Sequence, residues 1–255
     1  MFDVPTILVI AATFLLAGSV KGITGLGLPT VSLALLTVAI DMPTAMALLL
    51  VPSFATNIWQ AAVGGNGREV LIRIWPFLLA ATVTVWFGAM ALTQVDFSIL
   101  SALLGGLLIV YGMTNLAGYS FQLSRKNEQW MGPVLGCING VLTGMTGSFV
   151  VPGVLYLQAI GLTRDALIQA MGMLFSASTL ALAMALQGNS LLSLELVTVS
   201  TLALAPAIFG MVIGQKIRKN LSEKVFKRVF FISLFLLGAY IVINALKYMA
   251  ITPTA

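Results

Sequence analysis

The sequence predicts an all-α integral membrane protein with two inverted-topology repeats. Each repeat is expected to hold one re-entrant or broken Gly/Pro helix element and three transmembrane helices. Three observations lead to this fold class: an apolar composition with few charges, a succession of eight apolar segments, and a duplication that runs through the chain.

The composition excludes a water-soluble globular protein. Hydrophobic residues make up 59% of the 255 residues and charged residues only 8%, whereas a soluble domain has about 25% charged residues. The net charge of +5 comes from Lys and Arg residues that collect at the ends of apolar segments. This placement indicates membrane topology rather than nucleic-acid binding.

Eight apolar segments follow one another along the chain, separated by short polar breaks. A helix needs about 20 residues to cross the ~30 Å apolar core of a bilayer. Six of the segments fit one crossing each, whereas the first and the fifth are longer. The segments are 4–38, 42–63, 70–92, 97–117, 130–160, 166–187, 191–214 and 229–247.

The first and fifth segments are predicted to be broken or re-entrant hairpins. At 35 and 31 residues they are long for one span and short for two. Each contains a glycine cluster followed by a proline, Pro29 or Pro152. Because proline is favoured in the first turn of a helix, each proline indicates the start of a second half-helix.

A secretory signal peptide is the alternative interpretation of residues 1–20, where Ala17-Gly18-Ser19 resembles a cleavage site. Asp3 is the one charge before this apolar run, where a signal peptide carries Lys or Arg. The same stretch also recurs later in the chain. The recurrence favours a helix of the mature protein.

The duplication pairs the four glycines within residues 18–27 with the four within 136–147. Later pairs keep the same order, and the offset drifts only from 118 to 123 before Gly106 pairs with Gly238 at 132. The four-residue glycine spacing also suits close packing of membrane helices. The other pairs include Ala39 with Ala159, Ser53 with Ser176, Thr56 with Thr179, Gly65 with Gly188, and Phe87 with Phe209.

The distribution of Lys and Arg decides the topology. If all eight segments cross, the positive residues divide almost evenly between the two sides. If the first and fifth segments enter and leave by one face, eleven of twelve lie on one side and Lys247 on the other, as the positive-inside rule favours. The eleven are Arg68, Arg73, Arg125, Lys126, Arg164, Lys216, Arg218, Lys219, Lys224, Lys227 and Arg228.

Three crossings in each repeat invert the second repeat relative to the first, and both termini are then expected outside the cell. The expected division is a membrane repeat at 1–120, a cytoplasmic linker at 121–129 and a second membrane repeat at 130–255. The two repeats are expected to form one membrane domain.

The residue inventory excludes most enzyme chemistry. The chain has no histidine, which removes Ser–His and Cys–His catalysis and His-ligated metals. The single Cys137 lies in an apolar stretch and is expected to be a small buried residue. The acidic residues lie at or near segment ends, which disfavours coupling through a mid-membrane carboxylate. No catalytic residue, metal site or cofactor is therefore expected.

The broken segments predict a site for a small anion near the bilayer midplane. Backbone N–H groups at a helix start attract anions, and the half-helices are expected to start near Pro29 and within 148–152. Lys21 places an ammonium group in an apolar segment, where a charge usually marks a ligand path. Snorkelling of Lys21 to the interface is the alternative. Asn139 occupies the corresponding place in the second repeat.

Amide and hydroxyl groups on these elements and on the next helices complete the candidate site. A hydroxyl in a membrane helix often bonds only to the carbonyl four residues back, but several of these positions recur in both repeats. The candidate substrate-binding residues are Lys21, Thr24, Gly25, Gly27, Ser53, Thr56, Asn57, Asn139, Thr143, Gly144, Thr146, Gly147, Ser148, Ser176 and Thr179.

The two glycine motifs resemble those of the sulfite exporter TauE/SafE family. The motifs are Gly22-x-x-Gly25-x-Gly27-x-Pro29 and Gly140-x-x-x-Gly144-x-x-Gly147-x-x-x-x-Pro152, and a helix start with an alanine, Ala45 or Ala166, follows each. The resemblance covers about residues 5–247. Family members usually show a denser glycine run, so this sequence departs from the family at that point.

The resemblance implies a secondary transporter that moves sulfite, sulfonates such as sulfoacetate, or related small anions across the cytoplasmic membrane of the cell by alternating access. An anion channel that uses the same cavity is the main alternative, followed by an intramembrane enzyme or a membrane assembly subunit. The expected partners are the small anionic substrate and the lipid bilayer, without nucleic acid. A homodimer stays open.

Overall fold

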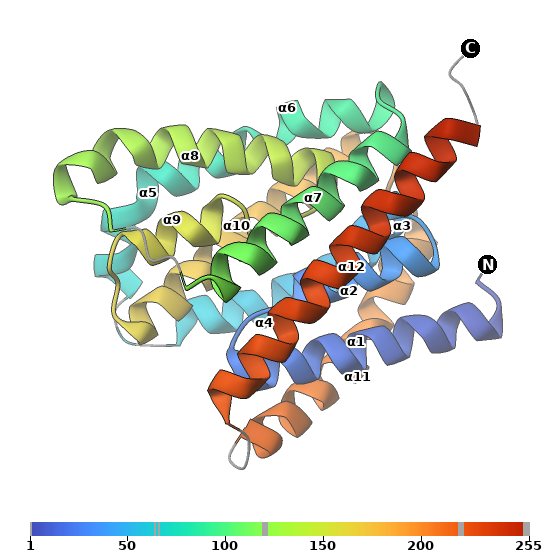
Figure 1. Ribbon diagram of the computed structural model, residues 1–255, viewed down its shortest axis with the longest axis horizontal. Helices are drawn as coiled ribbons and strands as arrows, with labels where there is room; N and C mark the ends of the chain where they lie inside the picture. The colour runs from blue at the N-terminus through green and yellow to red at the C-terminus, as the bar shows by residue number, and fades with distance from the viewer. Residues whose placement is uncertain (1, 64, 66, 119–121, 219–221, 252–255) are drawn as a thin grey trace.

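The computed structural model describes residues 2–63, 65, 67–118, 122–218 and 222–251, and all regular structure in these ranges is helical. The long helices lie side by side and form one bundle (Figure 1). Both chain ends lie on the same side of this bundle, at the right of Figure 1. The all-helical fold class predicted from the sequence is therefore confirmed.

Each half of the chain begins with a long helix and a short return helix, and the helices that follow are interrupted in the first half and continuous in the second. The first half contains α1 (Val4–Thr24), α2 (Leu28–Ala39), α3 (Met42–Leu48), α4 (Leu50–Ala62), α5 (Gly67–Val83), α6 (Val85–Ala89), the 3₁₀ turn η1 (Met90–Thr93) and α7 (Phe97–Leu116). The second half contains α8 (Arg125–Thr146), α9 (Gly153–Ala159), α10 (Arg164–Gly188), α11 (Leu194–Arg218) and α12 (Glu223–Ile251).

The first glycine cluster breaks the chain between α1 and α2. Gly25 ends α1 in the left-handed conformation (φ 80°), and its N–H donates to the carbonyl of Lys21. Gly27 precedes α2 with φ 100°, and Pro29 lies in the first turn of α2. Both positive φ angles favour glycine. The prediction of a helix restart at Pro29 is confirmed.

The second glycine cluster makes the same break. Gly147 ends α8 in the left-handed conformation (φ 73°), as Gly25 ends α1. The chain then passes through Pro152 and starts α9 at Gly153. In both hairpins the first limb is a long helix of 21 or 22 residues, and the second limb is short, with 12 residues in α2 and 7 in α9.

Six helical stretches in the described residues are long and apolar enough to span a bilayer, and the bent pair α3–α4 raises this number to seven. The broken element of the first repeat thus begins with a helix, α1, that is itself long enough to cross. The six stretches are Val4–Thr24, Gly67–Thr93, Phe97–Leu116, Arg164–Gly188, Leu194–Arg218 and Lys224–Ala250.

Helices of each half of the chain pack against helices of the other half. The first limb of one hairpin, α1, packs against α11, while the corresponding limb α8 packs against α5 and α6. Corresponding helices also pair with each other, α4 with α10 and α7 with α12. This pattern is the one that a pseudo-two-fold axis would produce, so the fold is compatible with two inverted repeats.

Glycine allows these helix pairs to approach closely. A Cβ placed on Gly18 of α1 would lie 2.1 Å from the carbonyl oxygen of Ala207 on α11. A Cβ on Gly140 of α8 would lie 2.3 Å from the carbonyl oxygen of Ala81 on α5. Both distances are far too short for a side chain, so the four-residue glycine spacing serves packing in both repeats.

One glycine pair differs from the sequence prediction. A Cβ on Gly105 and one on Gly238 would each lie 2.7 Å from the other residue's carbonyl oxygen, whereas Gly106, which the alignment pairs with Gly238, has open space around it. Within the expected linker 121–129, α8 begins at Arg125.

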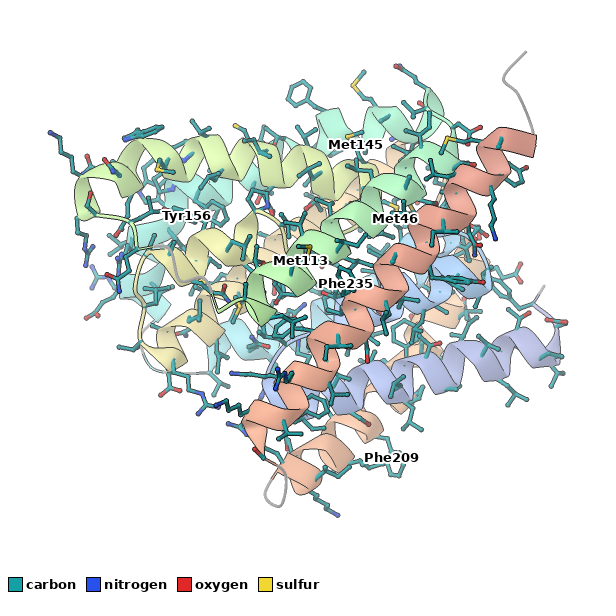
Figure 2. The ribbon with its side chains drawn as sticks, viewed as in Figure 1. Met46, Met113, Met145, Tyr156, Phe209 and Phe235 are labelled. Atoms are coloured by element: carbon teal, nitrogen blue, oxygen red, sulfur yellow. The ribbon has the colours of Figure 1, made fainter. Side chains whose placement is uncertain are left out.

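The outer surface of the bundle is apolar, as lipid contact requires. Phe209 is 63% exposed and points away from the helices (Figure 2). Cys137 is likewise exposed, so the prediction that it is buried was wrong. Its place on α8 explains this result, since the glycines Gly136 and Gly140 face α5 and Cys137 does not share their side of the helix.

The connections that carry most positive residues lie away from the chain ends. The α4–α5, α7–α8 and α9–α10 connections lie on the side opposite to the two termini (Figure 1). The α11–α12 connection contains the basic run that begins at Lys216, but its residues 219–221, including Lys219, lie outside the described residues. This arrangement agrees with hairpins that enter and leave by one face.

Candidate functional site

Lys21 is buried in the first hairpin, with only 4% of its surface exposed. Its Nζ donates hydrogen bonds to Oγ1 of Thr56, at 3.2 Å, and to Oδ1 of Asn57, both on α4. Among the described residues these are the partners of the ammonium group, and neither is a carboxylate. Snorkelling to the interface therefore does not describe this lysine, and its charge is held by neutral oxygens inside the bundle.

Helix α4 joins this cluster to the second half of the chain through α10. Gln60 donates to the carbonyl of Ile168 at 2.8 Å, and Gln169 donates to the carbonyl of Ala61 at 2.8 Å. Gly172 packs against the same part of α4. The register set by these antiparallel contacts brings Ser53 and Ser176, which correspond to each other in the two repeats, to the same level of the pair.

In the second hairpin, Asn139 joins α8 to the start of α9. Its Oδ1 accepts the backbone N–H of Gly153 at 2.8 Å, and the residue is fully buried. The first N–H of α9 is thus already occupied, so this donor does not face a ligand as the sequence reasoning expected. The side-chain amide of Asn139 supplies a donor instead, because its Nδ2 has no partner.

Four hydroxyl residues of the predicted site lie at the two hairpin turns, and three of the hydroxyls are used there. Thr24 bonds to the carbonyl of Val20 at 2.9 Å, and Thr146 bonds to the carbonyl of Leu142 at 2.6 Å. Thr143 donates to the carbonyl of Ser148 at 2.9 Å. These three hydroxyls hold the turns, whereas the Oγ of Ser148 is buried without a partner.

The four glycines of the predicted site have backbone and packing roles. Gly25, Gly27 and Gly147 provide the positive φ angles of the turns. Gly144 lies against α6, where a Cβ would be 2.1 Å from the carbonyl oxygen of Val85. These residues shape the two turns and allow α8 to pack closely against α6.

Buried polar atoms without hydrogen-bond partners concentrate in the predicted site. A buried polar atom without a partner is costly and calls for an explanation. Six of the fifteen predicted residues carry such an atom, namely Ser53, Asn57, Asn139, Ser148, Ser176 and Thr179. Both halves of the chain contribute, through α4, α8, α10 and the second hairpin turn.

The structure gathers these residues in two groups rather than in one open pocket. Lys21, Thr56 and Asn57 form the first group, and Asn139 with the second hairpin turn forms the other. No contact between Lys21 and Asn139 is found in the described ranges. Three surface cavities formed by described residues are lined by residues other than these.

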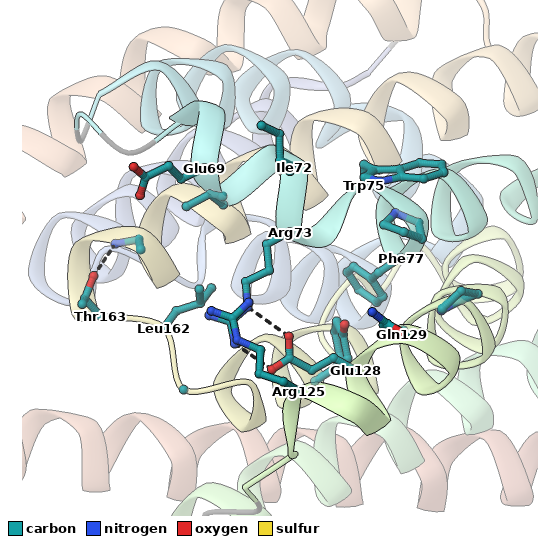
Figure 3. Close-up of a pocket in the computed structure, with 17 residues that line it drawn as sticks. Glu69, Ile72, Arg73, Trp75, Phe77, Arg125, Glu128, Gln129, Leu162 and Thr163 are labelled. Carbon is teal, nitrogen blue, oxygen red and sulfur yellow. Dashed lines mark hydrogen bonds and ion pairs between the residues drawn. The ribbon is translucent and has the colours of Figure 1, made fainter.

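A buried ion pair was missed by the sequence reasoning. Arg73 on α5 bonds to Glu128 on α8 through Nε at 3.0 Å and through Nη2 at 2.7 Å (Figure 3). Glu128 is only 8% exposed, although it lies near a segment end as the sequence indicates. Nothing in the sequence connects these residues, 55 positions apart, except that both are charges at the border of apolar segments.

Comparison with known proteins provides independent evidence. The sequence model of the family described as Sulfite exporter TauE/SafE matches residues 10–241, nearly the whole chain. The chain belongs to the TauE/SafE family. No curated protein and no solved structure matches the chain.

Membership of the TauE/SafE family identifies the protein as a membrane anion transporter. The apolar helices long enough to span a bilayer agree with a multi-pass membrane protein. The resemblance inferred from the glycine motifs is therefore confirmed.

Proposed function

We propose that this TauE/SafE protein is a secondary transporter that exports sulfite or small sulfonates such as sulfoacetate across the cytoplasmic membrane by alternating access. The proposed site lies between the two hairpins and on the α4–α10 pair. Lys21, Asn57 and Asn139 are its central residues, with the hydroxyls of Ser53, Ser148, Ser176 and Thr179 around them.

The observation that carries this proposal is a buried ammonium group without an anionic partner. Lys21 bonds to neutral oxygens of Thr56 and Asn57, and a buried cation is costly unless it is paired. A singly charged sulfur oxyanion would neutralise it. The unpartnered amides of Asn57 and Asn139 would donate to the oxygens of that anion.

The charge balance of the site favours a small anion that is released again. One formal positive charge within a set of neutral donors holds an anion less tightly than two positive charges would. An inside-negative membrane potential contributes about 2.3 kcal/mol per charge per 100 mV to outward movement of an anion. Export therefore needs no coupling ion.

The orientation of the protein follows from the positive-inside rule. The α4–α5, α7–α8 and α9–α10 connections lie on one side of the bundle, opposite to the chain ends (Figure 1). Placing these connections in the cytoplasm puts both termini outside the cell. This orientation assigns the cavity near Arg73 to the cytoplasmic face.

A thermal-shift panel on detergent-purified protein tests the proposed substrate class. The ligands are sulfite, sulfoacetate, thiosulfate, taurine, sulfate and acetate, each over a range of concentrations. A ligand present at 100 times its Kd stabilises the folded state by about 2.7 kcal/mol. We expect sulfite or sulfoacetate to raise the melting temperature most. A shift that is the same for acetate and for the sulfur anions would overturn the assignment.

A further inference from the structure

A cavity of about 800 Å³ opens beside the buried Arg73–Glu128 pair. It lies between α5, α8, α9 and the start of α10 (Figure 3). Arg73 and Arg125 are its positive residues, and Glu69 and Glu128 are its negative ones. These four formal charges sum to zero. The carboxylate of Glu128 neutralises Arg73 and occupies the position at the guanidinium that another anion would take.

The guanidinium of Arg73 has the geometry that binds an oxyanion with two oxygens. Its Nε and Nη2 donate to the two carboxylate oxygens of Glu128, and Nη2 also donates to the carbonyl of Ile160. These bonds leave Nη1 as a further donor. The two-oxygen arrangement is the one in which arginine recognises carboxylates and other oxyanions.

The cavity and the Asn139 part of the proposed substrate site lie along the same two helices, α8 and α9. At its inner end Tyr156 of α9 lies against α8, since a Cβ on Gly132 would be 2.8 Å from the Tyr156 hydroxyl. One turn before Tyr156, at the start of α9, Gly153 contacts Asn139. The two helices thus run in opposite directions, with the cavity at one end and Asn139 deeper in the bundle.

An aromatic contact separates the cavity from the deeper site. The rings of Phe77 and Tyr156 are 4.6 Å apart between their centres, and Tyr156 is only 4% exposed. Both residues line the cavity. An anion that has reached Arg73 therefore meets the Phe77–Tyr156 contact before it can reach Asn139.

We propose that this cavity is the loading site of the transporter, in which an incoming sulfur oxyanion replaces Glu128 as the partner of Arg73. This inference rests on the proposed function. Glu128 acts as an internal competitor that keeps the arginine neutralised while no substrate is present. Movement of Tyr156 away from Phe77 then opens the route from Arg73 to Asn139. The ligand class is a small sulfite or sulfonate anion with at least two oxygens free to accept from one guanidinium.

Uptake of radiolabelled sulfite into membrane vesicles of the two orientations tests the loading site. Everted vesicles present the cytoplasmic face to the label, and right-side-out vesicles present the other face. The variants are Glu128→Gln, Arg73→Gln and the double variant with both changes. Arg68→Gln is the matched control, because Arg68 is an exposed arginine of the same helix outside the cavity.

The expected half-saturating sulfite concentration depends on which face of the membrane is exposed to the label. In everted vesicles Glu128→Gln should lower the half-saturating sulfite concentration roughly tenfold, because the anion no longer competes with an ionised carboxylate for charge-assisted bonds. Arg73→Gln and the double variant should raise it by a similar factor. In right-side-out vesicles all variants should resemble the wild type, and Arg68→Gln should do so on both faces.

The opposite outcomes overturn the loading site. If Glu128→Gln leaves the half-saturating concentration unchanged or raises it, Glu128 is not a competitor of the substrate. If Glu128→Gln does not fold, the double variant decides, because it has no unpaired charge, and an unchanged cytoplasmic value would refute the role of Arg73. Failure of the proposed function would give a different result from failure of the loading site, because wild-type vesicles would then show no saturable sulfite uptake.

Discussion

The Nζ atom of Lys21 on α1 lies 3.2 Å from Oγ1 of Thr56 on α4, and the Thr56 hydroxyl donates its own hydrogen bond to the carbonyl of Pro52 at 2.7 Å. The lysine is thereby held in place inside the bundle by a chain of neutral groups. These neutral groups do not cancel the charge of the lysine, as the proposed anion site requires.

Replacing Lys21 should separate anion affinity from stability. Lys21→Met should weaken sulfite binding at least about tenfold, since a hydrogen bond to a charged group contributes roughly 1.5–3 kcal/mol. The melting temperature without ligand should change little, because removal of the buried charge offsets the loss of its hydrogen bonds to Thr56 and Asn57. Calorimetric titration and thermal unfolding measure the two effects. Lys247→Met, at an exposed position of α12, is the control, and equal affinities in both variants would remove Lys21 from the site.

Two substitutions of Asn139 should distinguish its role toward the ligand from its role in the hairpin. Asn139→Ala removes the acceptor for Gly153 and should lower both stability and affinity. Asn139→Asp keeps an acceptor for Gly153 but replaces the free Nδ2 donor with an oxygen. We therefore expect Asn139→Asp to keep more of the wild-type melting temperature and yet to bind sulfite more weakly than Asn139→Ala. A tighter complex with Asn139→Asp would contradict contact with an anion.

A methyl group on Gly18 should disrupt the contact between α1 and α11. Its Cβ would lie 2.1 Å from the carbonyl oxygen of Ala207, and overpacking of this kind costs about 1–3 kcal/mol. Gly18→Ala should lower the melting temperature in detergent by several degrees. Gly106→Ala, another helical glycine with open space around it, should leave it unchanged. Similar values for the two variants would show that α1 and α11 do not pack closely.

The orientation can be tested with reporter fusions. An alkaline phosphatase fused after residue 124 should be inactive, because that connection is expected in the cytoplasm where its disulfides do not form. The same reporter fused at the C-terminus should be active. Equal activity at the two positions would place both on one face and would refute the inverted repeats.

Much of the fold could be predicted because its local signals are strong. Pro29 and Pro152 follow glycine clusters, and left-handed glycines with a following proline specify a helix break wherever they occur. The lengths of α2 and α9 could not be predicted in the same way, because their ends depend on contacts with neighbouring helices. The apolar character of its segment does not show whether Cys137 is exposed, and the one sequence signal is the Gly136–Gly140 spacing, which places Cys137 off the closely packed face.

The candidate site could be predicted only in part. Lys21 stands out in the sequence because a charge within an apolar segment is rare, and the structure gives it buried partners. Thr24, Thr143 and Thr146 look the same in the sequence, but their hydroxyls are used at the hairpin turns. Arg73 and Glu128 were missed, because only the packing of α5 against α8 brings the two charges together.

Counterflow of radiolabelled sulfite in proteoliposomes is the most direct test of the claim that the Lys21 site binds sulfite in a carrier cycle. The liposomes are preloaded with unlabelled sulfite and diluted into a trace of label. The wild type and Lys247→Met should accumulate label transiently above its equilibrium level, and Lys21→Met should not. A steady approach to equilibrium in the wild type, independent of preloading, would indicate a channel, and equal accumulation in Lys21→Met would contradict the site.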